Sequence, residues 1–100
     1  MKKKKNLKSS ITNEMYKCLI CGSYRNIEIH HIFDDKEKSI KYGLIIPLCS
    51  YHHTGSSIAV HGRDGQKLDL ELKRLGQKAF EWKYTRKEFI ERFGENYLCE

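Results

Sequence analysis

The sequence lacks a long hydrophobic run. None of its apolar stretches approaches the roughly 20 residues that a helix needs to cross a bilayer, so no membrane-spanning segment is expected. Residues 1–5 could be mistaken for the basic start of a secretory signal, but residues 11–17 supply no apolar stretch to follow it. An internal repeat is also lacking, and 100 residues are the size of one small domain. We therefore expect a single domain that stays in the cytoplasm.

Acidic residues are too few to balance the basic ones. The chain has 13 Asp and Glu against 19 Lys and Arg, which gives a net charge of +6 with neutral histidines. This balance favours a polyanionic partner, and nucleic acid is the first candidate. Residues 1–14 are predicted to be a flexible basic arm before the folded residues 15–100. The lysines of this arm are Lys2, Lys3, Lys4, Lys5 and Lys8. They either contact phosphate or only aid solubility.

Cysteines and histidines are concentrated in a few short segments. Cys18-x-x-Cys21 and Cys49-x-x-His52 are two half-sites with the spacing that lets a tight turn direct both ligands at one ion. In a reducing compartment this spacing predicts a metal site rather than a disulfide. The fourth cysteine, Cys99, lies alone near the chain end and is interpreted as a bystander. The half-sites together predict one closed tetrahedral metal site, with free thiols in a core as the alternative.

Histidines in excess of that site predict a second one. A structural zinc needs four ligands, so His30, His31 and His53 are left over for an open, catalytic site. Two alternatives stay open: His31 is a packed structural histidine, or His53 replaces His52 in the closed site. His61 follows an apolar stretch and has three interpretations, namely a third catalytic-metal ligand, a phosphate contact or a structural residue.

Two short strands are predicted around the histidine doublet. Residues 27–33 are rich in β-branched residues and begin with clean alternation, and residues 44–48 form a second, apolar run. The charged residues 34–39 between them are interpreted as a surface loop. Gly22, after the second cysteine, is expected to supply an unusual backbone angle. Adjacent strand residues point to opposite faces, so the two histidines of the doublet should play different parts.

Helical periodicity begins after the glycine-rich region. One amphipathic helix is predicted over residues 67–83, with Trp82 at the end of its apolar series and Gly76 as a weak point. Thr85-x-x-Glu88 has the form of a capping box for a short final helix. Gly94 is expected to end that helix.

The order of these motifs resembles the HNH nucleases. The resemblance rests on Cys-x-x-Cys, on His-His-Ile at a strand end and on Pro-Leu-Cys-x-x-His-His. It is strongest to small phage HNH proteins of the RecA-dependent recombination-enhancement type, which share the pattern of residues 46–53 and a later Val60-His61. The similarity covers about residues 18–97. It implies an α+β fold: a small ββα-metal (HNH) domain with structural zinc knuckles and C-terminal helices.

The resemblance also implies a role for each residue. The structural zinc ligands would be Cys18, Cys21, Cys49 and His52. His31 would be the general base, while His30 and His53 would hold a catalytic Mg²⁺ or Mn²⁺. Since imidazoles are soft ligands for Mg²⁺, Ni²⁺ or Zn²⁺ are alternatives. The central Asn of the HNH pattern has no counterpart at Gly43 or Leu44. A backbone carbonyl could orient the catalytic histidine in its place.

The function implied by the resemblance is metal-dependent hydrolysis of DNA phosphodiester bonds. Its setting would be a bacterial host cell carrying a phage or prophage, with a recombinase filament as a further partner. The alternative is a zinc-stabilised nucleic-acid-binding module whose catalytic centre has lapsed. The missing Asn favours this alternative, and the retained histidines favour the nuclease. Tyr51, Arg63 and Lys67 are candidate phosphate contacts, with surface solvation as the other interpretation of each.

Overall fold

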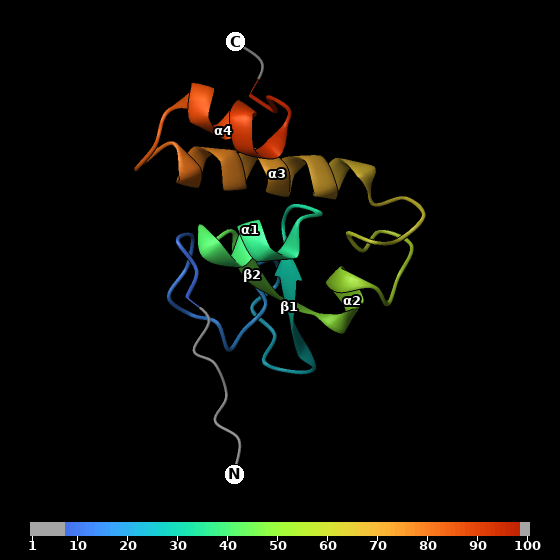
Figure 1. Ribbon diagram of the computed structural model, residues 1–100. Coiled ribbons are helices and arrows are strands. Elements are labelled where there is room, and N and C mark those ends of the chain that lie inside the picture. The colour runs from blue at the N-terminus through green and yellow to red at the C-terminus, as the bar shows by residue number, and fades with distance from the viewer. Residues whose placement is uncertain (1–7, 99–100) are drawn as a thin grey trace.

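Six short elements follow one another in the computed structural model, which describes residues 8–98. In chain order they are β1 (Ile27–His31), α1 (Lys36–Lys41), β2 (Ile45–Cys49), α2 (Ser50–His53), α3 (Gln66–Phe80) and α4 (Arg86–Phe93). In Figure 1, α3 lies between α4 on one side and the layer of the sheet, α1 and α2 on the other. The predicted α+β class is confirmed. Among the helices of residues 8–98, none combines the length and apolar character that crossing a bilayer requires.

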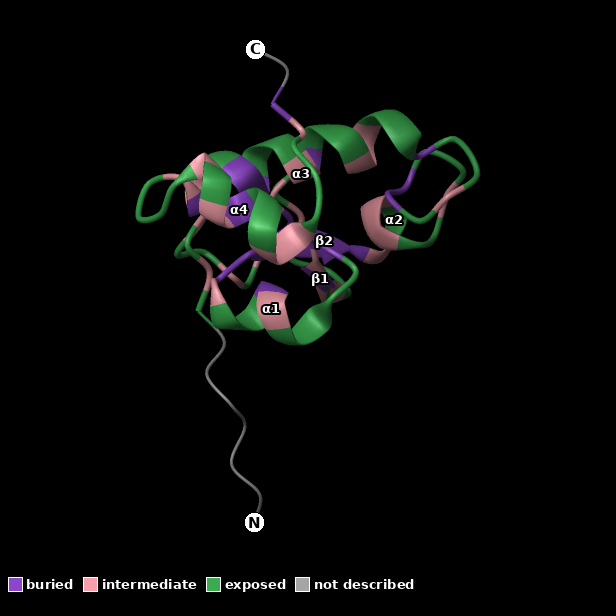
Figure 2. Cartoon of the chain, turned by 45° about the horizontal axis from the view of Figure 1, so that its top comes forward, coloured by how far each residue is buried: buried purple, intermediate pink, exposed green. Residues whose placement is uncertain are grey.

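The sheet is a single antiparallel pair of strands. The register places His30 opposite Ile46 and His31 opposite Ile45, while Ile27 pairs with Cys49. Every residue of β2 is buried (Figure 2), as its continuous apolar run requires. Both predicted strands are therefore present, with bounds shifted by one or two residues. The backbone N–H of Leu19 donates to the Pro47 carbonyl at 2.9 Å and attaches the first cysteine loop to β2.

The expectation of a loop over residues 34–39 was wrong, because α1 begins at Lys36. The Asp35 side chain caps this helix by accepting a hydrogen bond from the Lys38 backbone N–H at 3.0 Å. Ser39 is completely buried, and its hydroxyl bonds to both the N–H and the carbonyl of Phe33. These two polar anchors outweigh the high charge of the segment and fix Lys36 next to the end of β1.

The C-terminal helices follow the prediction with one correction. Thr85 and Glu88 form the expected capping box, and Gly94 ends α4 with a φ of +83°. However, α3 ends at Phe80 rather than at residue 83, because the following residues turn back and donate hydrogen bonds to Ala79 and Phe80. Trp82 is therefore not on the buried face of a helix; it is 88% exposed.

Gly76 brings α3 close to the segment that follows β1. A Cβ at this position would lie 3.0 Å from Cε2 of Phe33 and 3.2 Å from Cγ2 of Ile32. The predicted weak point of the helix is thus a site of close packing. Phe33 continues the contact into the aromatic core, with ring centroids 5.4 Å from Phe89 and 4.7 Å from Phe93.

The described chain begins inside the segment expected to be an arm. Ser10 donates its backbone N–H to the Gly43 carbonyl at 2.8 Å, and Ile11 packs partly buried against the core. Lys2, Lys3, Lys4, Lys5 and Cys99 lie outside the described residues.

Candidate metal centres

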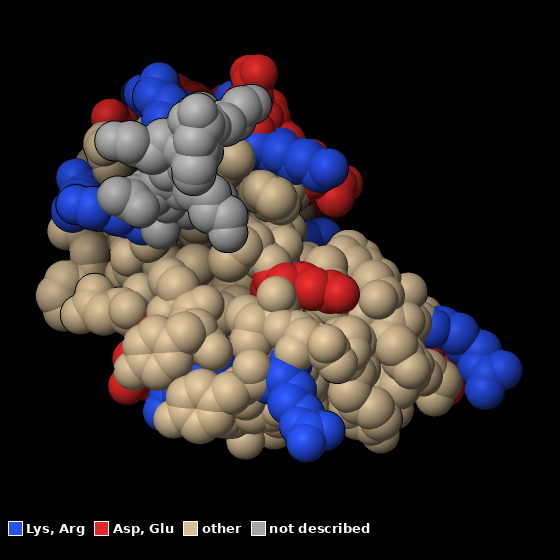
Figure 3. Space-filling view, turned by 90° about the horizontal axis from the view of Figure 1, so that it is seen from below, with Lys and Arg blue, Asp and Glu red and all other residues tan. Residues whose placement is uncertain are grey.

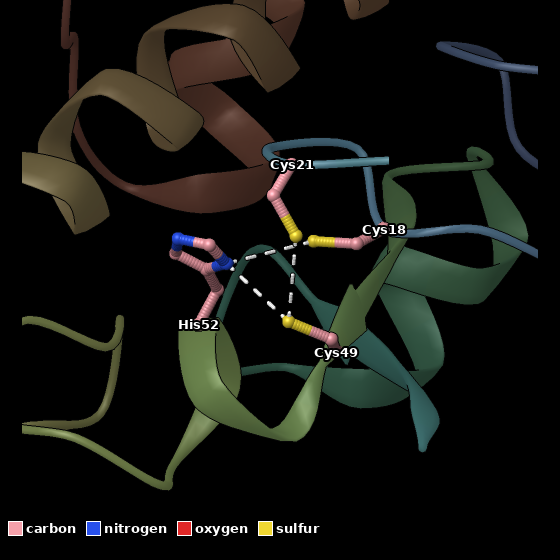
Figure 4. Close-up of side chains that lie close together, drawn as sticks. All are labelled: Cys18, Cys21, Cys49 and His52. Carbon is pink, nitrogen blue, oxygen red and sulfur yellow. Dashed lines mark hydrogen bonds between the residues drawn. The ribbon is translucent and has the colours of Figure 1, made fainter. Parts of the chain in front are cut away.

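Three cysteines and one histidine converge at the end of the sheet (Figure 4). The ligand atoms of Cys18, Cys21, Cys49 and His52, here called the cysteine cluster, all lie within 4.8 Å of one another. Sγ of Cys49 is 3.3 Å from Nδ1 of His52 and 3.8 Å from Sγ of Cys21. His52, rather than His53, joins the cysteines. The cysteine cluster could hold a metal ion.

Local backbone structure explains how each half-site brings its own two ligands together. The Cys18 carbonyl accepts a hydrogen bond from the Gly22 N–H, and the Cys18 N–H donates to the Ser23 carbonyl, each at 2.8 Å. Gly22 has a φ of +77°, the left-handed conformation expected from the sequence. Cys49 is the last residue of β2 and the N-cap of α2, so His52 lies one helical turn further along the same side.

The Cys18 side chain has the electrostatics of a metal ligand. Its burial raises the pKa of the thiol, but hydrogen bonds from the backbone of Cys49, Cys21 and Ile20 together outweigh burial and lower the pKa to about 6. A thiolate is the form of cysteine that binds metal ions. The backbone of the loop and of Cys49 therefore favours the binding form of this residue before any ion arrives.

A second cluster contains three histidines. The ring nitrogens of His30 on β1, His53 on α2 and His61 in the following loop, here called the histidine cluster, also lie within 4.8 Å of one another. His30 is 2% exposed, and its Nε2 has no hydrogen-bond partner within residues 8–98. A buried unpaired polar atom costs about 1–3 kcal/mol. Coordination of an ion is one way to satisfy this nitrogen, so the histidine cluster could also hold a metal.

Burial also sets the protonation state of His30, the most buried member of this cluster. Burial of His30 lowers its pKa to about 3, and the charges of His53, His61, His31 and Lys73 act in the same direction. The imidazole of His30 is therefore neutral at cell pH. A neutral imidazole is the form that binds metal ions.

The loop that carries His61 is fastened to α2. The backbone N–H of His61 donates to the His53 carbonyl at 3.0 Å, and that of Val60 donates to the His52 carbonyl at 2.8 Å. A side chain at Gly62 would collide with the carbonyl of Ser56, so this turn depends on glycine. The loop thus holds His61 at a fixed place beside His53.

Glu28 was not among the predicted site residues, yet it contacts one of them. Its Oε1 lies 2.6 Å from Nδ1 of His53. A carboxylate that accepts the Nδ1 proton fixes the tautomer of a histidine and directs Nε2 toward an ion. The sequence did contain a signal: Glu28 is two residues before His30 and so shares its face of β1.

His31 lines the same cavity as the three clustered histidines. This cavity has a volume of about 300 Å³, and Lys36 also lines it. Burial lowers the pKa of His31, as do the nearby charges of Lys36 and His53. Within residues 8–98 no hydrogen bond orients the His31 imidazole, so the backbone carbonyl expected to replace the missing Asn is not seen there.

The other candidate phosphate contacts do not line this cavity. Tyr51, Arg63 and Lys67 are exposed, and none of them lines its wall. Arg63 contacts only the neighbouring Asp64, at 3.5 Å, among the ion pairs of the described residues. Among residues 8–98, Lys36 is the cationic side chain that lines the cavity. It was not predicted as a site residue because its segment was expected to be a surface loop.

Comparisons with known proteins add no constraint to this geometry. No family model matches the chain, and no significant match was found among curated proteins or solved structures.

Proposed function

We propose that this protein is a metal-dependent DNA endonuclease of the HNH type, built on a ββα-metal domain. The observation that carries the proposal is the convergence of His30, His53 and His61 in a cavity that His31 also lines. A binding module has no need for four imidazoles in one cavity, whereas phosphodiester hydrolysis needs a base and a cation. In this proposal β1, β2 and α2 form the ββα unit.

The ion of the cysteine cluster is proposed to be a structural zinc. Zn²⁺ binds sulfur at about 2.3 Å, which puts tetrahedral sulfurs about 3.8 Å apart. The sulfurs of Cys21 and Cys49 are separated by 3.8 Å. Nδ1 of His52 lies 3.8 Å from Sγ of Cys18 and 3.3 Å from Sγ of Cys49, on either side of the roughly 3.6 Å expected between a sulfur and a nitrogen ligand. Donor type and spacing both fit zinc with all four positions taken by protein.

The histidine cluster is proposed to hold the catalytic ion. His61 serves as a third ligand beside His30 and His53, which favours Mn²⁺, Ni²⁺ or Zn²⁺ over Mg²⁺ because imidazole is a soft donor. When bound, the ion would stabilise negative charge on the phosphate and on the leaving oxygen. His31, whose ring is not part of the cluster, would accept the proton of the attacking water. Lys36 would attract the phosphate to the cavity.

DNA is the proposed substrate because of the charge balance of +6. The excess of basic side chains does not form a basic patch on every face of the molecule. On the face in Figure 3, the basic side chains lie apart from one another and an acidic side chain lies near the centre. A recombinase filament is a second proposed partner, and it rests on the resemblance to recombination-type nucleases alone.

A lapsed, zinc-stabilised nucleic-acid-binding module is the second candidate. Two observations favour it: neither Gly43 nor Leu44 can replace the orienting Asn, and no hydrogen bond within residues 8–98 fixes the His31 ring. An unoriented imidazole is a weaker base, since its productive tautomer and direction are not selected.

Cleavage of supercoiled plasmid and single-stranded DNA distinguishes the two candidates. The full, purified chain would be assayed with Mg²⁺, Mn²⁺, Ni²⁺ or Zn²⁺, beside a His31→Ala variant of equal zinc content and circular dichroism. The nuclease proposal expects ion-dependent cleavage that falls by about 10²- to 10⁴-fold in the variant. Absence of cleavage with every ion by the zinc-loaded, folded protein would favour the lapsed module.

A further inference from the structure

Two hollows adjoin each other beside the C-terminal half of α3. Their volumes are about 470 and 460 Å³. Ser10, Ala79 and Lys83 belong to the walls of both, so the two hollows form one continuous depression, here called the α3 groove. Neither of the proposed metal sites contributes a residue to it.

The walls of the α3 groove carry charge of one sign. Lys8, Lys41, Lys78 and Lys83 line it, and no Asp or Glu among residues 8–98 does. None of these four lysines forms an ion pair within residues 8–98. The nearby Glu81 is engaged by Arg86 at 3.0 Å and does not neutralise them. The groove therefore attracts a polyanion.

Two aromatic side chains stand among these lysines. Trp82 is 88% exposed and Tyr84 is 39% exposed. An exposed tryptophan beside lysines offers a flat surface for stacking to a partner that brings both rings and negative charge. Nucleic-acid bases supply the rings, and unpaired bases expose their faces, whereas a duplex keeps them stacked inside.

We propose that the α3 groove binds single-stranded DNA, with the phosphates on its lysines and a base stacked on Trp82. The choice of DNA over RNA rests on the proposed nuclease function. α1 connects the two regions, because Lys36 at its start lines the histidine cavity and Lys41 at its end lines the groove. Its six residues span about 9 Å. A strand held in the groove would thus lie near the cavity.

Trp82 is the chain's one tryptophan, so its fluorescence reports directly on the groove. The full, zinc-loaded chain would be titrated with oligothymidylate without added divalent ions, and affinity would be measured by anisotropy of the labelled oligonucleotide. We expect quenching of the tryptophan emission and a loss of about 5- to 150-fold in affinity for Trp82→Ala. Trp82→Phe, which keeps a ring, should recover much of this loss.

The lysines of the α3 groove can be tested through the salt dependence of DNA binding. Replacing Lys41 or Lys83 by Gln should reduce the slope of log affinity against log salt by about 0.7 for each phosphate that the substituted side chain no longer neutralises. Lys87→Gln is the matched control, since Lys87 is exposed on α4 and lines neither hollow. Its slope should equal that of the unmodified protein.

Several results would overturn the groove assignment. Unchanged affinity in Trp82→Ala without quenching would do so, and so would tighter binding of oligouridylate than of oligothymidylate. A lower molecular mass of Trp82→Ala in sedimentation, without quenching of the parent by DNA, would instead identify a second copy of the chain as the occupant. Binding of single-stranded DNA at Trp82 without cleavage under any ion would support the groove and contradict the nuclease proposal. Cleavage without quenching of Trp82 would support the nuclease proposal and contradict the groove.

Discussion

The two clusters differ in donor chemistry and in closure. The cysteine cluster has four donors, three of them soft sulfurs, and so can fill a tetrahedral coordination sphere. The histidine cluster has three donors and faces a cavity of about 300 Å³. A complete sphere leaves no position for a substrate, whereas three ligands leave at least one. The first cluster is therefore suited to structural support and the second to chemistry.

Both clusters depend on α2. Its consecutive residues His52 and His53 serve different clusters, and the loop carrying His61 bonds back to the same helix. A helix of four residues has little stability of its own. An ion bound by Cys49 and His52 would therefore hold α2 in place for the histidine cluster. The dependence should run in one direction only, because no side chain of the histidine cluster is a ligand in the cysteine cluster.

Removal of the cysteine site should have the largest effect. We expect Cys49→Ser to lose its zinc and to unfold, because structural zinc contributes folding free energy directly, about 10–16 kcal/mol in small zinc domains. Metal analysis and thermal unfolding followed by circular dichroism would measure both losses. Cys99→Ser is the control and should retain one zinc and the parent melting temperature. A folded Cys49→Ser protein that still binds an ion at the histidine cluster would break the proposed dependence.

Removal of one ligand from the histidine cluster should affect only that cluster. In His61→Ala we expect affinity for the second ion to fall by more than about 100-fold, beyond the range seen for residues that only support a ligand. Calorimetric titration of zinc-loaded protein with Mn²⁺ or Ni²⁺ would measure this. His31→Ala should bind the second ion normally, because His31 is proposed as a base. Equal losses in both variants would show that the two roles are not separate.

The sequence was sufficient to predict the cysteine cluster. The spacing of Cys18, Cys21, Cys49 and His52 determines local turns, and local turns depend on neighbouring residues. The capping box at Thr85 was predictable for the same reason. The capping box and the turn within each half-site need no knowledge of how distant segments pack. The pairing of the two half-sites is a long-range contact, supported by the Leu19–Pro47 hydrogen bond, and was predicted because one tetrahedral ion needs four ligands.

Features that depend on distant packing were less predictable. The fixed position of His61 arises from hydrogen bonds to α2 and from a turn at Gly62, neither of which has a periodic signal. α1 escaped prediction because the charge of its segment suggested a loop more strongly than the Asp35 cap suggested a helix. Trp82 falls on the helical period of the preceding residues, but α3 ends at Phe80. In each case tertiary contacts decided between two locally acceptable structures.

Glu28 provides a finer test of the second cluster. Glu28→Gln should weaken ion binding at the histidine cluster by about 10- to 100-fold, because a neutral amide holds the His53 tautomer less firmly than a carboxylate. The same calorimetric titration measures it, and the zinc of the cysteine cluster should be retained. Glu91→Gln on α4 is the matched control, since it removes an equal charge from an exposed side chain that does not line the histidine cavity. A comparable loss of ion affinity in the control would show that the effect comes from the change in net charge rather than from the contact with His53.

Gly76 tests whether the packing behind the histidine doublet matters to one cluster more than to the other. In Gly76→Ala the added methyl would press on Phe33 and Ile32, which directly follow His31. Overpacking costs about 1–3 kcal/mol, while the gain in helix propensity recovers about 1 kcal/mol, so a small net destabilisation is expected. Urea unfolding would measure it, with the exposed Glu71→Ala as a control for propensity. Because the added methyl presses on residues at the end of β1, affinity for the second ion should decrease while the zinc content of the cysteine cluster stays the same. Equal effects on the binding of both ions would show that the strain is spread over the whole domain.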